Sequence, residues 1–189
     1  MIRLFLFIVC QLTLLTTAFA QSAQRQPATK ILVAFFSHTN NTRLVAEDIR
    51  RHVDGDIFEI TPRNPYPGDH QQTVNIARNE RDRNLRPVLA ATIPAETMLQ
   101  YDVIFIGYPN WWMTMPMIIR TFLEQHDLSG KTIVPFCTHE GSGLSNTVTE
   151  LRDLLPNANV LQGLAVPGRM ASQAQHDVTN WLRDLRFIH

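Results

Sequence analysis

Residues 30–42, KILVAFFSHTNNT, determine the fold that the rest of the chain follows. An apolar run at 31–36 stops at six polar residues, 37–42, and a helical pattern follows from Arg43. This order predicts a buried strand that leads through a tight loop into a helix. The start of such a helix presents free backbone N–H groups and the positive end of its dipole, so the loop is a candidate anion site.

The side chains of this first polar loop narrow the kind of anion. Neither the glycine-and-lysine P-loop pattern nor G-x-G-x-x-G is present, whereas three hydroxyls and two amides are. The pattern indicates a single phosphate held by neutral donors. The alternative is an ordinary capped turn, since Ser, Thr and Asn are also the preferred N-caps. The candidate phosphate ligands are Ser37, Thr39, Asn40, Asn41 and Thr42.

The first twenty residues have the pattern of a secretory signal. Arg3 precedes the apolar stretch 4–15, and Ala18-Phe19-Ala20 forms a cleavage site, so we expect export to the periplasm or the medium. A membrane anchor is the alternative, but the stretch is shorter than the roughly 20 apolar residues that a span needs, so no stable insertion is expected after cleavage. Residues 21–29 are predicted to be a disordered leader, and 30–189 a single domain.

The charge and cysteine content of the mature chain exclude several classes of protein. Of the 17 Lys and Arg residues only Arg3 is lost with the signal, and none of the 17 Asp and Glu, which leaves a net charge near −1. No nucleic-acid partner is therefore expected. Cys137 is the only cysteine left, which excludes a disulfide scaffold, and its place in an apolar run favours a core thiol.

The remainder of the chain alternates between strand and helix patterns. Residues 103–107 form an unbroken apolar run, as expected for a strand buried on both faces of a parallel sheet. Alternation of this kind predicts an α/β fold, a doubly wound five-stranded parallel sheet with right-handed crossovers. The predicted strands are 31–36, 56–60, 103–107, 131–136 and 159–165; the main predicted helices start near 43, 70, 116, 144 and 172.

Two more loops follow predicted strands, at the sheet edge where ligands of such folds bind. The second loop has two adjacent indoles, one of which would be free to stack on a planar ligand, although both could simply pack over the sheet edge. The third loop has two glycines that allow close backbone approach, although it could equally be a flexible connection. The residues concerned are Pro109, Asn110, Trp111 and Trp112, and Thr138, His139, Glu140, Gly141, Ser142 and Gly143.

Together the three loops offer a phosphate seat, an aromatic platform and a donor-rich edge, which are the three needs of FMN. The chain also resembles the flavodoxin-like proteins, specifically an exported group of them, over about residues 30–187. The residues that carry the resemblance are FFSHTNNT at 35–42, YDVIFIGYPNWW at 101–112, TFLE at 121–124 and KTIVPFCTHEGSGL at 131–144.

The resemblance implies strand order 2-1-3-4-5, non-covalent FMN and a role for each loop. The first loop would hold the phosphate, the second would flank the ring, and the third would border its pyrimidine side and the ribityl chain. The chain departs from the family at Asn40 and Met113, where glycine is usual, and at His139-Glu140, where small residues are common. Asn tolerates positive φ well, so phosphate binding should survive.

Three functions remain open at this level. The first is a redox carrier that transfers electrons through FMN between protein partners, although the near-zero charge lacks the acidic face usual in such carriers. The second is an FMN-dependent NAD(P)H:quinone-type reductase of small acceptors, for which segment 61–100 could supply a wall or lid. The third is a cofactor-free binding module. No metal-ligand spacing and no G-x-S-x-G nucleophile motif occurs.

Overall fold

The computed structural model describes residues 29–189. The signal peptide predicted for 1–20 lies outside the described residues, as does the predicted leader up to residue 28. No helix of residues 29–189 has the length and apolar character needed to cross a membrane.

The centre of the fold is a parallel sheet in which β1 (Ile31–Phe35) lies between β2 (Asp56–Glu59) and β3 (Val103–Pro109). The next strand, β4 (Thr132–His139), pairs with β3 along its whole length. The order is β2-β1-β3-β4-β5, which confirms the predicted strand order and fold class. All these strands run in the same direction, so their carboxyl ends meet at one edge of the sheet.

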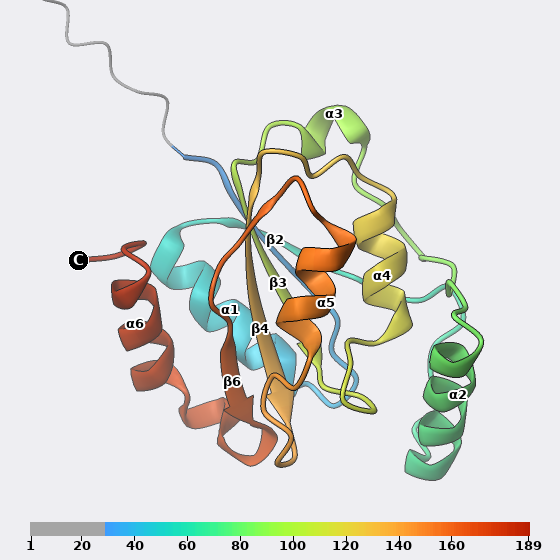
Figure 1. The fold of residues 1–189 in the computed structure, drawn as a ribbon. Helices are drawn as coiled ribbons and strands as arrows, with labels where there is room; N and C mark the ends of the chain where they lie inside the picture. Colours follow the sequence, from blue (N-terminus) through green and yellow to red (C-terminus); the bar gives the residue numbers. More distant parts are fainter. Residues whose placement is uncertain (1–28) are drawn as a thin grey trace, which may run out of the picture.

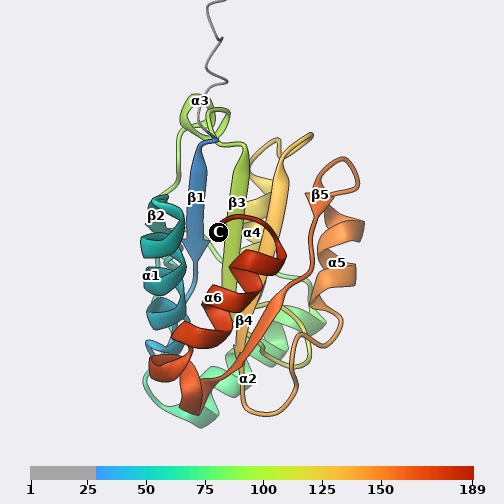
Figure 2. The same ribbon diagram turned by 90° about the vertical axis from the view of Figure 1, so that its left-hand side faces the viewer.

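Helices cover both faces of the sheet (Figures 1 and 2). On one face lie α1 (Asn41–Val53) and α6 (Gln175–Asp184), which bury Ile49 and Leu182. On the other lie α4 (Met117–Glu124) and α5 (Thr147–Leu154), which bury Phe122 and Leu151. Each face therefore has its own apolar core, which fixes the sheet and the positions of its strand ends.

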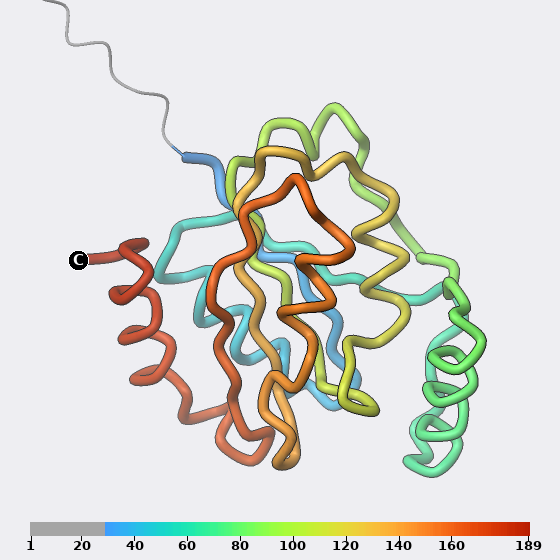
Figure 3. The backbone as a smooth tube through the Cα atoms, in the orientation of Figure 1, coloured from blue at the N-terminus to red at the C-terminus, as the bar shows by residue number. Residues whose placement is uncertain are grey.

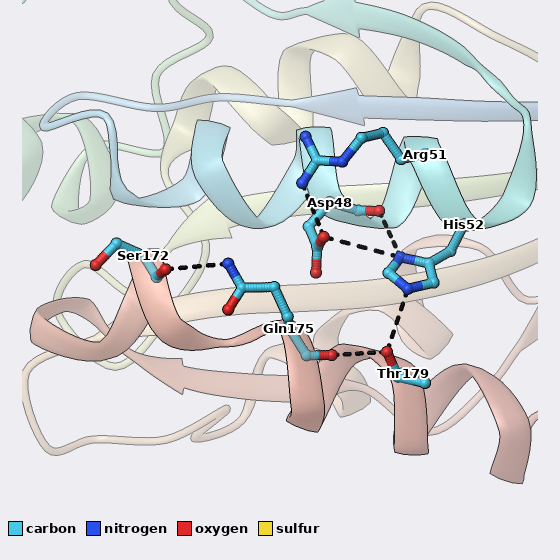
Figure 4. A network of polar contacts seen from close by, with 6 residues as sticks. All are labelled: Asp48, Arg51, His52, Ser172, Gln175 and Thr179. Atoms are coloured by element: carbon cyan, nitrogen blue, oxygen red, sulfur yellow. Dashed lines mark hydrogen bonds and ion pairs between the residues drawn. The ribbon is translucent and has the colours of Figure 1, made fainter.

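A polar network also joins α1 to α6 (Figure 4). His52 Nδ1 lies 2.8 Å from the Asp48 carbonyl oxygen and its Nε2 lies 3.2 Å from Thr179 Oγ1. Arg51 donates to Asp48 Oδ1 at 2.8 Å, which compensates the carboxylate for its burial. The network holds α6 against the helix that opens from the first polar loop.

The last predicted strand, 159–165, is interrupted, so the sheet has six strands. Its halves are β5 (Asn159–Val160) and β6 (Leu164–Pro167), and both pair with β4. Between them the pairing slips by one residue, from Ile133↔Val160 to Phe136↔Leu164. Pro135 lies at the slip and has no amide hydrogen to donate, which accounts for the break. A 3₁₀ helix, η1 (Gly168–Gln173), follows β6.

Helix α2 (His70–Asp82) stands apart from the sheet and belongs to an excursion of the chain (Figure 3). The two ends of the excursion pair with each other, because Arg63 N donates to Val88 O at 2.7 Å and Ala90 N donates to Thr61 O at 2.8 Å. The short helix α3 (Ala95–Met98) comes after this neck. In Figures 1 and 2, α2 lies at the level of the carboxyl ends of the strands.

Candidate functional site

A cavity of about 630 Å³ lies at the carboxyl edge of the sheet, and we call it the edge cavity. This volume is within the usual range of small-molecule sites. All three predicted loops, helix α2 and the start of η1 contribute to its wall. Its lining residues are His38, Thr39, Asn41, His70, Thr73, Val74, Ala77, Pro109, Asn110, Trp111, Trp112, Thr138, His139, Glu140, Ser142 and Gly168.

The first loop brings the free end of α1 to this cavity. Asn40 is the N-cap at φ 71°, a left-handed conformation, and no side chain caps the helix. The first bond into the helix is from the Leu44 amide to the Asn40 carbonyl, at 3.1 Å, so the amides of residues 41–43 have no intrahelical acceptor. Asn40 thus occupies the conformation for which glycine is usual, and the donors needed for an anion face outward.

Thr42, which is predicted as a phosphate ligand, also contacts the third loop. Its Oγ1 lies 2.8 Å from Thr138 Oγ1, and both residues are buried. This bond ties the first loop to the end of β4. The hydroxyl predicted as a phosphate ligand therefore connects two loops, and the hydroxyl of Thr138 does the same.

The second loop is a tight turn in which two bulky residues have positive φ. Trp111 N and Thr114 O are 3.0 Å apart, and the reverse pair is 3.1 Å apart. Between them Trp112 has φ 56° and Met113 has φ 66°. The turn resembles a type I′ hairpin turn, which normally takes Asn-Gly, so Met113 occupies a position that favours glycine.

The two indoles of the turn point to different neighbours. Trp111 lies edge-on to Phe36, Tyr66 and His38, with ring centroids 5.4, 5.1 and 5.8 Å away. Trp112 faces α2, where its Nε1 donates to the Val74 carbonyl at 3.2 Å. The guanidinium carbons of Arg78 and Arg81 lie 4.2 and 5.0 Å from the Trp112 ring centre. Trp111 therefore packs against the first loop and Tyr66, and Trp112 connects the turn to α2.

Asn110 connects the second loop to the third. Its side-chain Nδ2 donates to Gly143 O at 2.8 Å and lies 2.9 Å from Ser145 Oγ. Its backbone N–H donates to Thr138 O at 2.7 Å. Gly141 and Gly143 have φ 125° and 59°, so the third loop uses the conformational freedom of both. The third loop is thus a defined structure that the second loop holds in place.

His139 and Glu140 both line the edge cavity, in different ways. His139 Nδ1 accepts the Gly141 amide at 2.9 Å, which fixes the ring on its own loop. A methyl group added to Gly168 would overlap the Glu140 carboxylate and lie 2.8 Å from Asn41 Nδ2. The carboxylate and the start of α1 therefore converge over Gly168, and this places a negative charge beside the candidate anion site.

His38 and His70 line one part of the cavity, from the first loop and from the start of α2. Burial lowers the pKa of His38, and the positive charge of a protonated His70 lowers it further. His38 is therefore a neutral imidazole at neutral pH, with one N–H to donate.

Two buried polar atoms near the cavity have no partner among the described residues: Ser37 Oγ and Asn110 Oδ1. Buried polar atoms in folded proteins are normally hydrogen-bonded, and those without a protein partner often bind a ligand or a water molecule. Together with the uncapped start of α1, these atoms fit a ligand that carries an anionic group and further polar edges.

Most of the predicted site residues meet in this cavity. Ser37, Asn40, Thr42, Gly141 and Gly143 lie in the same loops but do not line it. The sequence prediction missed His38, Gly168 and four residues of α2. Those four are His70, Thr73, Val74 and Ala77, whose spacing places them on one helix face, and that spacing was the available signal.

Cys137 is buried beneath the third loop, where burial raises its pKa to about 12. Its Sγ lies 3.3 Å from Gly143 O, so it is a packed, protonated core thiol. Among residues 29–189, no three or more His, Cys, Asp or Glu side chains lie close enough together to hold a metal ion.

The sequence and the structure are both similar to those of known proteins. The sequence profile of the family described as "Flavodoxin" matches residues 30–185. No match was found among curated proteins. Two crystal structures of proteins provisionally assigned as flavoproteins are similar. That from Bacteroides eggerthii is 36% identical, with 82% of this chain and 97% of that chain covered and a TM-score of 0.71. That from Bacteroides uniformis is 33% identical, with 82% and 98% covered and a TM-score of 0.71.

A more distant structure shares the fold. It is a Lactobacillus acidophilus flavoprotein, solved in complex with FMN, at 24% identity and a TM-score of 0.62. The alignment covers 77% of this chain and 98% of that chain.

Proposed function

The chain belongs to the flavodoxin family, and from that membership we propose that it binds one FMN non-covalently and passes electrons through it. The observation that carries the proposal is the convergence of three loops with different chemistry on one cavity. The start of α1 with Ser37 and Thr39 would hold the phosphate. The second loop would flank the ring, and the third would supply polar groups to its edge.

The chain's own residues would do three things for this cofactor. Free amides at the start of α1 bind the phosphate without a lysine or arginine, as a helix N-terminus can. Asn110 keeps the second and third loops in register, and the Thr42–Thr138 bond does the same for the first and third. Trp111 and its aromatic neighbours exclude water from one side. When bound, FMN supplies the capacity to accept and release one or two electrons.

The Lactobacillus protein has the same fold and was solved in complex with FMN, so this fold can hold the proposed cofactor. The test is the absorption spectrum of the purified mature protein. We expect a yellow protein, or a colourless one that turns yellow with added FMN. Protein that stays colourless after incubation with excess FMN would refute the proposal.

Two roles are compatible with bound FMN: a carrier between protein partners and a reductase of small acceptors. The position of α2 along the edge cavity favours the reductase, because a walled cavity suits a small acceptor better than a protein. Photoreduction separates the two roles. A one-electron semiquinone that accumulates would support a carrier, and direct two-electron reduction with turnover of NAD(P)H and a quinone would support the reductase.

We also propose that the protein is exported after cleavage following Ala20. The support is the sequence pattern alone. N-terminal sequencing of the protein recovered from the periplasm or the medium should begin at Gln21. An intact N-terminus in the cytoplasm would refute export.

A further inference from the structure

Met113 lies in the turn of the second loop and has no part in the proposed flavin site. Its φ of 66° is a left-handed conformation that favours glycine over a long side chain. The residue is 56% exposed, whereas Met115 and Met117 in the same stretch are buried, at 0% and 4%. Small solutes can therefore reach the thioether of Met113 but not those of its two neighbours.

The exposed thioether of Met113 contacts a residue that follows the third loop. Ser145 Oγ lies 3.6 Å from Met113 Sδ, within the range of a hydrogen bond to sulfur. The same hydroxyl lies 3.0 Å from Ser142 O and 2.9 Å from Asn110 Nδ2. The Asn110 Nδ2 group can only donate, so the one hydrogen of the hydroxyl has two possible acceptors. Those acceptors are Ser142 O in the third loop and Met113 Sδ in the second.

The oxidation state of the sulfur decides between these two acceptors. A thioether is a weak acceptor and a backbone carbonyl is a strong one, so Ser145 donates to Ser142 while Met113 is reduced. In that state the Ser145 hydroxyl closes the third loop. Oxidation to the sulfoxide makes the side chain polar and gives it an oxygen that accepts hydrogen bonds well. The sulfoxide would therefore compete with Ser142 for the hydrogen.

We propose that Met113 is a site of reversible oxidation, and that its sulfoxide draws the Ser145 hydroxyl away from Ser142 and loosens the third loop. The oxidant is a peroxide. An S–O bond forms between Sδ and one oxygen of hydrogen peroxide, the O–O bond breaks, and water leaves; the sulfur is oxidised and the peroxide reduced. Thiol-dependent sulfoxide reductases reverse the change, since two thiols become a disulfide and the oxygen leaves as water.

The other methionines of the mature chain provide internal comparisons. Met98, like Met115 and Met117, is buried and only 1% exposed. Met170 is 39% exposed, but it belongs to η1 and lies outside the second and third loops. An effect of oxidation on the third loop should therefore depend on Met113 and not on Met170.

The first test exposes the mature chain to hydrogen peroxide and locates each sulfoxide by tandem mass spectrometry. We expect Met113 and Met170 to be oxidised at least about tenfold faster than the three buried methionines, because susceptibility follows exposure. Similar oxidation rates of Met113 and Met115 would overturn the inference.

Matched variants separate the two exposed methionines. Met170→Leu leaves Met113 to react, and Met113→Leu leaves Met170. After peroxide treatment, we expect hydrogen exchange at residues 139–146 to rise about fivefold in Met170→Leu, in keeping with the loss of one loop hydrogen bond. It should change less than about twofold in Met113→Leu. Methionine sulfoxide reductases of both stereospecificities, with dithiothreitol, should restore the original exchange in Met170→Leu. Equal responses of the two variants would contradict the assignment.

Ser145→Ala tests the route by which the oxidation acts. The variant has no hydroxyl hydrogen for the sulfoxide to take from Ser142. We expect Met113 to be oxidised as in the wild type, while hydrogen exchange of the third loop no longer responds to the oxidation. A response as large as that of the wild type would contradict the role of Ser145.

Titration with FMN connects the oxidation to the proposed function, on which this last readout rests. The third loop would border the flavin, so we expect oxidation of Met170→Leu to weaken FMN binding about fivefold. Unchanged FMN affinity would overturn the connection between the sulfoxide and the cofactor. A chain that binds no FMN before oxidation would instead refute the proposed function, and hydrogen exchange would still test the oxidation site.

Discussion

The two sides of the edge cavity are built on different principles. Loop residues such as Asn41, Asn110 and Thr138 directly continue elements of the sheet and of α1, and hydrogen bonds between the loops, one buried and one partly buried, connect them. Helix α2 lies outside the sheet, and Trp112 and Tyr66 hold it through side-chain contacts. We therefore expect the loop side to open only when the whole protein unfolds. Helix α2 should open locally, at a lower free energy.

The two sides would therefore suit different tasks: the loop side the binding of a cofactor, and α2 the entry and exit of a substrate. A rigid loop side would suit the proposed role of holding FMN, because a cofactor stays in place for many turnovers. A substrate that enters and leaves in each turnover benefits from a wall that can move.

The largest effect should come from comparing the adjacent tryptophans. Trp111→Ala removes an indole that packs on Phe36 and Tyr66, and we expect a loss of about 3 kcal/mol in the free energy of unfolding. Trp112→Ala removes the link to α2, and we expect a loss of about 1 kcal/mol with faster hydrogen exchange confined to residues 70–82. Urea unfolding and exchange mass spectrometry measure the two quantities.

Equal effects of Trp111→Ala and Trp112→Ala on unfolding and on hydrogen exchange would contradict the difference between the loop side and α2. Trp112→Phe serves as the matched control, because it keeps an aromatic ring beside Arg78 but loses the Nε1 donor. Exchange in α2 should then be intermediate between that of the wild type and that of Trp112→Ala.

The second prediction concerns the bond that joins the first and third loops. Thr42→Val keeps the shape of the side chain but leaves the Thr138 hydroxyl buried without its partner. We expect a loss of about 1–2 kcal/mol in the free energy of unfolding. The double variant Thr42→Val/Thr138→Val should recover much of this loss, since replacing both partners of a buried pair can be nearly neutral.

Additive effects in this cycle, measured by urea unfolding, would show that the two hydroxyls act independently. In that case the loop side would not have the rigid connection described above.

The third prediction concerns Glu140, whose carboxylate converges with Asn41 over Gly168. In water, two unit charges about 4 Å apart repel by roughly 1 kcal/mol, so Glu140→Gln should tighten FMN binding up to about fivefold. The gain should shrink as salt is added. Riboflavin, which has no phosphate, serves as the control ligand. If Glu140→Gln improves riboflavin binding as much as FMN binding, the effect does not arise from the phosphate.

The smallest effect is a pH dependence of the local stability of helix α2. Burial raises the pKa of Glu80 more than the Tyr66 hydrogen bond lowers it. The folded state therefore favours the protonated carboxyl, so this contribution to stability is fully present below the ordinary pKa and is lost as pH rises through the raised value. Hydrogen exchange of residues 70–82, corrected for the intrinsic pH effect, should show weaker protection at the higher pH. Glu80→Gln should remove the difference, and an unchanged pH dependence in that variant would contradict this origin.

The sequence was sufficient to predict the loop side because its signals are local. The apolar run 31–36 and the polar residues after it predict β1, the loop and α1, and the structure confirms the strand order that follows. The fifth strand was harder, because its interruption comes from Pro135 on the neighbouring strand, whose effect depends on pairing.

The position of α2 beside the cavity could not be predicted from the sequence. The sequence predicts a helix over 70–84, and the structure has one at 70–82, but the sequence does not show which partner its weak apolar face meets. The two tryptophans illustrate the same limit. Alternation in an extended chain would send them to opposite sides, but positive φ at Trp112 and Met113 forms a turn that directs Trp111 to Phe36 and Tyr66 and Trp112 to α2. Such turns are set by the surrounding structure more than by their own residues.

The most direct test of the account is an equilibrium titration of the FMN-free chain with FMN and with riboflavin, followed by flavin fluorescence. We expect one flavin per chain, with FMN bound at least about tenfold more tightly than riboflavin, because the amides at the start of α1 receive the phosphate. Equal affinity for the two flavins would contradict the phosphate seat, and no binding of either would contradict the site as a whole.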